Sequence, residues 1–339
     1  MRDFRECVEE LKAVASEWAE SHPDEMEKIF GAKPRKNGKK TKAAGACMAK
    51  NGTDRNYVSS DEYYTKYSTI DFIIRLYDPA VFENKFVYCN CDSNKSNIYI
   101  WFKDNFERLK LRRLVATGIS YDPESVLGMY YEYDGIEERS RRMEWTGSFN
   151  SYESLRILGE CDMCITNPPF SMITEYMRTV IDSGKMFITF MGNMNICNSY
   201  ILDQYIKEKF YVIMTSHVGF RIIGPNWFDT STGKVINSIL VGNIPGSKEL
   251  EKSIAMKFEG VHYDSKIHKK YDNYDAVNCD SRNKIPNIEG LIGVPVTIIN
   301  SKPYDRDEIE LVGCLKDTYI DGKPRFNRII IRLRHPRKN

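Results

Sequence analysis

The sequence lacks the long apolar runs that identify membrane proteins. No stretch approaches the roughly 18 continuous apolar residues that a membrane-spanning helix needs. The first residues, Met1 to Glu6, also lack the apolar core of a signal peptide, since most of them are charged. We therefore expect a protein of the cytoplasm that has no membrane partner.

A disulfide framework and a metal site are also not expected. The nine cysteines are an odd number and follow no repeating spacing, which indicates reduced thiols. Cys161 and Cys164 form a C-x-x-C pair, but no second pair or nearby histidine completes a zinc ligand set. The five histidines are scattered without a cluster. We expect no metal.

Net charge excludes little, but its distribution is informative. The chain of 339 residues has a formal charge of only +2, and its 42% hydrophobic content allows a substantial core in one large domain or two joined ones. Between residues 33 and 42, however, six cations occur with no acid. They are Lys33, Arg35, Lys36, Lys39, Lys40 and Lys42. This stretch is either a phosphate-binding arm or a solvated linker.

From about residue 60, helical patterns alternate with short β-rich runs. The strand candidates are 86–91, 111–117, 163–166, 187–191, 210–215 and 236–241, and the helix candidates are 70–76, 98–109, 171–183 and 201–207. Such alternation predicts a mainly parallel sheet that is covered on both faces. Ligands of such sheets bind beyond the carboxyl ends of the strands, so residues 89–93 and 167–170 are expected at that edge.

The most informative motif follows the strand candidate 163–166. It reads Asn167-Pro168-Pro169-Phe170. An exocyclic amine of a base is a poor nucleophile, because its lone pair is delocalised into the ring. The Asn167 side-chain oxygen and the Pro168 carbonyl can each accept one N–H of that amine, and the Phe170 ring offers a stacking face.

The two prolines of this motif keep the acceptors rigid. A chance surface turn of this composition would arise in roughly one chain in a few hundred of this size. The motif therefore predicts methylation of an amino group on a base. The target atom is unreachable inside a duplex, so the base is expected to flip out of the stack.

The order of several short motifs is similar to that of the EcoRI-type adenine-specific DNA methyltransferases. The similarity runs from about residue 60 to the end. Its parts are Asp61–Thr65, Val87–Asp92, Gly147–Ser151, Asn167–Ser171, Gly192–Asn195, Tyr271–Asp275 and Gly293–Pro295. This resemblance implies a Rossmann-like class I methyltransferase core in an α/β fold, S-adenosylmethionine as cofactor and double-stranded DNA as partner.

The resemblance also implies roles for individual residues. A first motif would pack against the methionine part of the cofactor, a second would replace the glycine-rich turn after the first strand, and a third would border the cofactor adenine. The first motif supplies Asp61, Tyr64 and Thr65. The second supplies Cys89, Asn90, Cys91 and Asp92. The third supplies Phe149 and Asn150, and Asn167 would contact both the cofactor and the base. Asp92 would bind the amino group or the ribose.

Each of these positions has an ordinary structural alternative. Tyr64 could be a core aromatic, Phe149 could cap the core, and Asp92 could be a turn residue. Asn193 and Asn195 either border the flipped base or only shape a turn.

The usual Phe-x-Gly-x-Gly loop is absent here. Asn90 and Asp92 occupy positions where glycines generally let the backbone approach a ligand. The strand candidate 111–117 is followed by no acidic residue before Asp122, so no ribose ligand is assigned there.

These motifs divide the chain into three parts. Residues 1–58 would be a helical and basic extension, 59–215 the catalytic core, and 216–339 a target-recognition region whose C-terminal strands complete the core. Arg221, Asn226 and Lys234 are the candidates for base contacts. A monomer is expected.

The motif alone leaves other substrates open. They are the amino group of cytosine, adenine in RNA and glutamine in protein. A DNA-binding protein without catalytic activity is the alternative from another class.

Overall fold

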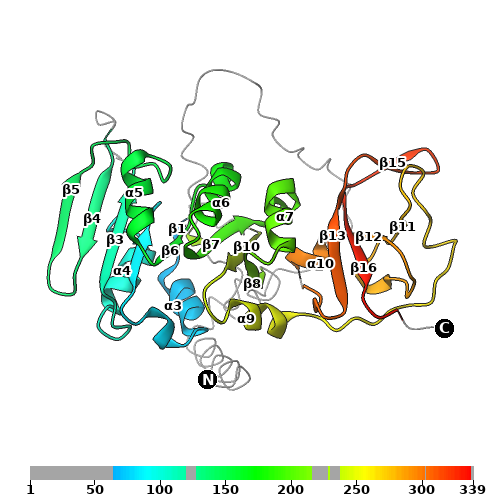
Figure 1. The fold of residues 1–339 in the computed structure, drawn as a ribbon, viewed down its shortest axis with the longest axis horizontal. Coiled ribbons are helices and arrows are strands. Elements are labelled where there is room, and N and C mark those ends of the chain that lie inside the picture. Colours follow the sequence, from blue (N-terminus) through cyan, green and yellow to red (C-terminus); the bar gives the residue numbers. More distant parts are fainter. Residues whose placement is uncertain (1–63, 120–126, 216–227, 230–236, 302, 337–339) are drawn as a thin grey trace, which may run out of the picture.

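The computed structural model describes residues 64–119, 127–215, 228–229, 237–301 and 303–336. The expected N-terminal helices and the basic stretch 33–42 lie outside these residues. The described chain is a mixed α/β structure in which a large central sheet lies next to a smaller C-terminal sheet (Figure 1).

The central sheet has eight strands in the order β5-β4-β3-β2-β6-β7-β10-β8. Their bounds, along the chain, are β2 Phe86–Cys89, β3 Arg113–Gly118, β4 Met129–Tyr133, β5 Glu138–Arg142, β6 Met163–Thr166, β7 Met186–Gly192, β8 Tyr211–Thr215 and β10 Ser238–Gly242. Strands β2, β3, β6 and β7 are parallel to one another. Only β4 and β10 run against them, since β5 and β8 are each antiparallel to one of these two. The sheet is thus mostly parallel, as expected.

Helices cover both faces of this sheet. Their bounds are α3 Tyr67–Arg75, α4 Asn97–Asp104, α5 Tyr152–Glu160, α6 Ile173–Asp182, α7 Ser199–Ile206 and α9 Ser247–Ile254. Side chains of α5, α6 and α7 belong to one apolar cluster, and those of α3, α4 and α9 belong to a second. Alternate residues of a strand point to opposite faces, so both clusters draw on the same strands.

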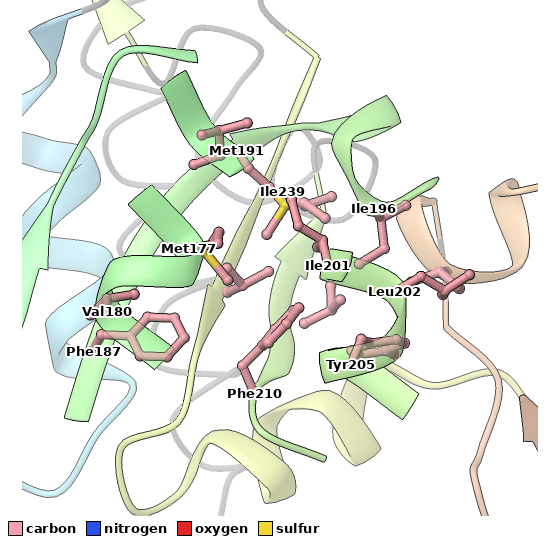
Figure 2. Packing of buried hydrophobic residues seen from close by; sticks show 14 of the residues in the cluster. Met177, Val180, Phe187, Met191, Ile196, Ile201, Leu202, Tyr205, Phe210 and Ile239 are labelled. Atoms are coloured by element: carbon pink, nitrogen blue, oxygen red, sulfur yellow. The ribbon is translucent and has the colours of Figure 1, made fainter. Parts of the chain in front are cut away.

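Figure 2 shows part of the first cluster. Met177 and Val180 of α6, together with Ile201 and Tyr205 of α7, pack against side chains of the sheet such as Phe187. All five side chains are at most 2% exposed. Full burial of such a side chain stabilises a fold by about 1.5–3 kcal/mol, so this layer fixes the position of α6 on the sheet.

Two strands of the central sheet and two of the helices that cover it were not predicted. The strands are β4 and β5, a hairpin that extends one edge, and the helices are α5 and α9. The β5 sequence is Glu-Arg-Ser-Arg-Arg and is mostly exposed, so it has no apolar alternation to reveal it. Its charges suit an edge strand, because they discourage pairing with another chain. All six predicted strands and all four predicted helices have counterparts, of which β6 has the predicted bounds and the others have shifted ends.

A second sheet is formed by the last part of the chain. It has the order β11-β12-β16-β13, with a hairpin of β14 and β15 beside it. The bounds are β11 Val277–Asn278, β12 Ile292–Val294, β13 Ile309–Leu315, β14 Thr318–Ile320, β15 Lys323–Arg325 and β16 Arg328–Leu333. These strands do not extend the central sheet, yet Ile309, Ile329 and Ile331 belong to the same apolar cluster as α6 and α7.

A buried ion pair fastens the C-terminal region to the central one. Arg306 Nε donates to Glu251 Oε1 over 2.6 Å, and its guanidinium lies 4.1 Å from the ring centre of Tyr205. The second oxygen of Glu251 accepts from the Tyr205 hydroxyl and from the backbone N–H of Val212. One carboxylate therefore joins α9, α7, β8 and the segment that leads into β13.

Candidate active site at the carboxyl ends of β2 and β6

The two motifs that were expected at one sheet edge lie side by side there. Strands β2 and β6 are neighbours in parallel register, with Tyr88 opposite Cys164. Strand order reverses between them, since the chain continues from β2 to β3 on one side and from β6 to β7 on the other. Ligands of open α/β sheets bind at such a reversal point.

Thr166, the last residue of β6, connects the two motifs. Its hydroxyl accepts the backbone N–H of Cys91 over 3.2 Å and donates to Asp92 Oδ2 over 2.5 Å. Its carbonyl accepts from the Thr189 hydroxyl of β7 over 3.1 Å. Asn167 is the next residue, so the turn after β2 and the Asn-Pro-Pro-Phe motif share one anchor.

Asp92 sits in a low-polarity setting for a carboxyl group. Burial raises its pKa to about 6, although hydrogen bonds from Thr166 and Ser96 act in the opposite direction. Burial also raises the pKa values of the nearby Cys89 and Cys91 thiols. Those thiols stay neutral and unreactive near pH 7, so Asp92 is the group that titrates at this edge.

Glycines from other segments compensate for the missing glycine-rich loop. A Cβ on Gly118, at the end of β3, would lie 3.0 Å from the carbonyl oxygen of Asp92. A Cβ on Gly147 would lie 2.3 Å from the Gly118 oxygen, and Gly147 has a φ of 76°. Three backbones therefore meet at this corner, which brings the segment before Phe149 next to Asp92.

The Asn-Pro-Pro-Phe motif forms a tight connection between β6 and α6. Asn167 Oδ1 and the Pro168 side chain are buried, and a 3-10 turn runs from Phe170 to Met172 before α6 begins. The Phe170 ring packs edge-on against Phe228 with ring centres 6.2 Å apart. Phe228 in turn contacts Phe190 of β7 over 5.2 Å. This row of rings fixes one side of the motif.

Phe228 also links the motif to the predicted cofactor segment. It belongs to β9 (Phe228–Asp229), which pairs with β1 (Tyr64–Thr65) so that Thr65 is opposite Phe228. The Thr65 carbonyl accepts from the Asn97 side chain at the start of α4 over 2.8 Å. Thr65 is thereby held next to the Asn-Pro-Pro-Phe motif although the two are about a hundred residues apart in sequence.

Three buried polar atoms at this edge have no hydrogen-bond partner within the described residues. They are Thr65 Oγ1, Asn90 Nδ2 and Asn193 Oδ1. Leaving such an atom unpaired costs about 1–3 kcal/mol, so most buried polar groups in proteins are paired. A hydroxyl, an amide N–H and an amide oxygen are therefore available to a polar ligand at the carboxyl ends of β2 and β7.

The predicted pair Phe149 and Asn150 lies at the start of α5. Phe149 is 3% exposed, and its ring centre is 5.4 Å from that of Tyr176 in α6. Its ring thus belongs to the core, which was the structural alternative for this position. Asn150 is exposed and donates to Glu175 in the first turn of α6 over 2.6 Å. Their contact with a cofactor stays a prediction.

Asn193 and Asn195 follow β7 directly. The Asn193 carbonyl accepts from the Asn300 side chain over 3.1 Å, which ties helix α10 (Thr297–Asn300) to this edge. A Cβ on Gly192 would lie 2.7 Å from Asn195 Oδ1 and 3.8 Å from the Phe170 ring. The segment after β7 therefore borders the Asn-Pro-Pro-Phe motif.

Several predicted site residues lie outside the described residues. They are Asp61, Lys33, Arg35, Lys36, Lys39, Lys40, Lys42, Arg221, Asn226 and Lys234. For Tyr64, the structure describes only the backbone in β1.

Sequence reasoning missed Phe228, Thr189 and Asn97. Phe228 reaches the site through the pairing of β1 with β9, and Asn97 reaches it from the start of α4. Neither contact has a local sequence signature. The position of Thr189 within the predicted strand 187–191 was the one available signal.

Within the described residues, no cluster of three or more histidine, cysteine or carboxylate side chains is arranged to hold a metal ion. Cys161 and Cys164 are both buried thiols. No helix in the same part of the chain combines the length and the hydropathy required to cross a membrane.

Comparison with known proteins indicates the family of the chain. No solved structure matches the chain. The chain is 29% identical to the type II methyltransferase M.EcoRI of Escherichia coli over 336 residues, which cover 86% of this chain and all of that protein. It is 27% identical to the type II methyltransferase M.MpnI of Mycoplasma pneumoniae, with 81% of this chain and 95% of that protein covered. The family model of the adenine-specific methyltransferase EcoRI matches residues 53–335, so the chain belongs to the EcoRI family of adenine-specific methyltransferases.

Proposed function

We propose that this DNA methyltransferase transfers a methyl group from S-adenosylmethionine to the N6 amino group of an adenine that has flipped out of duplex DNA. The observation that carries the proposal is the junction of Asn167 and Asp92 through Thr166 at the reversal point of the sheet. This junction supports the proposal, because the Asn-Pro-Pro-Phe motif and the turn after β2 follow neighbouring parallel strands.

The residues at the end of β2 fit a polar cofactor of this kind. S-adenosylmethionine supplies a methyl group that is already activated by its sulfonium charge. The Asp92 carboxylate can accept from ribose hydroxyls or an ammonium group. The unpaired Asn90 Nδ2 and Thr65 Oγ1 can satisfy further polar atoms of the same ligand.

The motif after β6 can orient the target amine. The side-chain oxygen of Asn167 and the carbonyl of Pro168 each accept one N–H, which holds the nitrogen lone pair toward the methyl donor. As the amine attacks, it gains positive charge, and the two oxygens stabilise that charge more strongly than they stabilise the neutral amine. Phe170 provides a ring face on which the adenine can stack, and the edge-on contact with Phe228 fixes the orientation of the Phe170 ring.

The strand order supports a Rossmann-like class I core. Four parallel strands form the centre, and the reversed strand β10 lies between β7 and β8. We assign residues 59–215 to the catalytic core and residues 216–339 to target recognition, with Arg221, Asn226 and Lys234 as candidates for base contacts. The cations between residues 33 and 42 would contact DNA phosphates. The protein would act as a monomer.

The test is to incubate the purified full chain with S-adenosylmethionine and unmethylated genomic DNA. Methylated nucleosides are then quantified by mass spectrometry, and their positions are mapped by sequencing. N6-methyladenine that is confined to one short sequence supports the proposal. Binding of S-adenosylmethionine without any DNA methylation would contradict the proposed substrate, and N4-methylcytosine would contradict the proposed base.

A further inference from the structure

A buried polar row crosses four adjacent strands at the level where β6 ends. It consists of Thr117 in β3, Asn90 after β2, Thr166 in β6 and Thr189 in β7, and each is at most 1% exposed. Thr166 is directly opposite Thr189, and the neighbouring registers place Asn90 next to Thr117 and Thr166. A valine in place of each threonine would fill the same space without burying a hydroxyl group. Packing alone therefore does not explain why threonines occupy these positions.

Thr166 differs from the other members because its hydroxyl contacts both Cys91 and Asp92 of the turn after β2. Its hydroxyl holds the Cys91 N–H and the Asp92 carboxylate, while its carbonyl is held by Thr189. A threonine side chain has few χ1 rotamers, and these contacts select one of them. The position of the Asp92 carboxylate and the direction in which the chain enters Asn167 are therefore set by the same residue.

We infer that Thr166 is a positioning residue that couples occupation of the cofactor site at Asp92 to the placement of Asn167 against the target base. This inference rests on the proposed function, since it takes Asp92 as a cofactor contact. A ligand that holds Asp92 also holds the Thr166 hydroxyl, and one peptide bond leads from there to Asn167. By thermodynamic reciprocity, the base held by Asn167 then strengthens binding of the cofactor.

Other groups around Asp92 do not provide this coupling. The Ser96 hydroxyl also forms a hydrogen bond with the Asp92 carboxyl. Ser96 is the N-cap of α4, however, so this hydrogen bond does not involve β6. The remaining titratable neighbours are the thiols of Cys89, Cys91 and Cys164, whose pKa values are all raised by burial. These stay neutral across the range in which Asp92 titrates.

The test compares Thr166→Val, which removes the hydroxyl, with Thr166→Ser, which keeps it. Affinity for S-adenosylmethionine is measured by calorimetry on the full chain without DNA, from pH 5 to 8, and kcat is measured on unmethylated genomic DNA. We expect Thr166→Val to weaken cofactor affinity about 10-fold, as for a lost hydrogen bond to a charged group, and to lower kcat at saturating cofactor. Thr166→Ser should restore both.

Two observations separate positioning from a merely structural role. The Thr166 hydrogen bond lowers the pKa of Asp92, so the midpoint of cofactor binding against pH should move upward in Thr166→Val. Thr189→Val, which frees the Thr166 carbonyl and also removes a hydrogen bond to Tyr176 but no contact with Asp92, should lower kcat while leaving cofactor affinity unchanged. Thr318→Val is the matched control, because Thr318 is equally buried and also donates one hydrogen bond, but lies in β14.

The outcomes distinguish this inference from the proposed function. If Asp92→Asn leaves cofactor affinity unchanged, the proposed cofactor contact is wrong and the coupling has no basis. If Asp92→Asn weakens binding but Thr166→Val and Thr189→Val change only the melting temperature, as Thr318→Val does, the coupling alone is overturned. Should Thr166→Val not fold, unchanged kcat in Thr189→Val would overturn it as well.

Discussion

Two asparagines show how the central sheet differs from the C-terminal sheet. Asn90 follows β2 and is 1% exposed, whereas Asn278 ends β11 and is 2% exposed. Both polar atoms of Asn278 are paired, with the Tyr271 hydroxyl at 2.9 Å and with Asp280 at 3.1 Å. Asn90 accepts from the Cys164 thiol, but its Nδ2 has no partner within the described residues.

The carboxylates beside these asparagines differ in the same way. Burial acts to raise the pKa of Asp280, but hydrogen bonds from Asn278 and Arg328 outweigh it, so that the pKa is lowered. The hydroxyls of Thr166 and Ser96 act to lower the pKa of Asp92, but burial outweighs them, so that the pKa is raised. The side chains of Asn278 and Asp280 thus have their partners within the protein, whereas Asn90 Nδ2 has none within the described residues.

The largest effect on stability is expected where the C-terminal region meets the central one. Arg306→Ala leaves Glu251 buried without its cation, and breaking a buried pair of this kind costs about 3–5 kcal/mol. Unfolding in urea measures the free energy. The control is Arg332→Ala, because the Arg332–Glu310 pair lies in the same region but is half exposed and should contribute at most about 1 kcal/mol. Equal losses in the two variants would contradict the assignment.

Asn167→Ala should reverse this pattern, with a large loss of activity and little loss of stability. Removing one preorganised group that stabilises transition-state charge lowers kcat by about 100- to 1000-fold. Affinity for S-adenosylmethionine should change little, because the second amine acceptor and the Asp92 turn remain. Methyl transfer to DNA and calorimetry measure the two quantities. Asn105→Ala is the control, since Asn105 caps the far end of α4. Full activity of Asn167→Ala would refute the catalytic role.

The comparison between the two asparagines can itself be tested by one substitution at each. Asn278→Ala removes two satisfied hydrogen bonds and should lower the free energy of unfolding by about 1–3 kcal/mol without weakening cofactor binding. Asn90→Ala removes an atom that is unpaired in the ligand-free protein, so its loss of stability should be smaller and its loss of cofactor affinity larger. If both variants lose only stability, the unpaired amide is not a ligand contact.

The sequence predicted the centre of the fold because the centre is apolar. Strand β6 was placed correctly at Met163–Thr166, since four buried residues run directly into the Asn-Pro-Pro-Phe motif. The edge strand β5 escaped prediction because charged residues form it, and its position depends on pairing with β4 rather than on its own composition.

The site was predictable as motifs but not as a network. Asn167 and Asp92 could be placed at one edge, because carboxyl ends of parallel strands meet there. The contact between Phe170 and Phe228 depends on a pairing of two-residue strands from distant parts of the chain. The close approach of Gly118 and Gly147 likewise depends on tertiary structure. Because the usual glycine-rich loop is absent after β2, the sequence did not indicate that these two glycines lie beside Asp92.

The smallest effect that we expect is a dependence on pH that has opposite signs for binding and for stability. With a pKa of about 6 in the folded protein, against 3.8 for an unperturbed group, Asp92 holds its proton more tightly when folded. Its contribution to the free energy of unfolding therefore decreases as the pH rises from about 4 to 6. The carboxylate that binds cofactor forms over the upper part of the same range, so affinity should increase with pH. At pH 5 only about one molecule in ten is ionised, which predicts binding about 10-fold weaker than at pH 7 to 8.

Calorimetric titration of the cofactor across this range measures the effect, and Asp92→Asn should make affinity nearly independent of pH. Asp280→Asn is the matched control, because the pKa of Asp280 is lowered and that group is already ionised at pH 5. A pH dependence that persists in Asp92→Asn would assign the titration to another group. If the pH dependence vanishes in Asp92→Asn and persists in Asp280→Asn, the carboxylate whose ionisation controls cofactor binding is Asp92, at the end of β2. Asp280, whose partners are supplied by the fold itself, is then not involved.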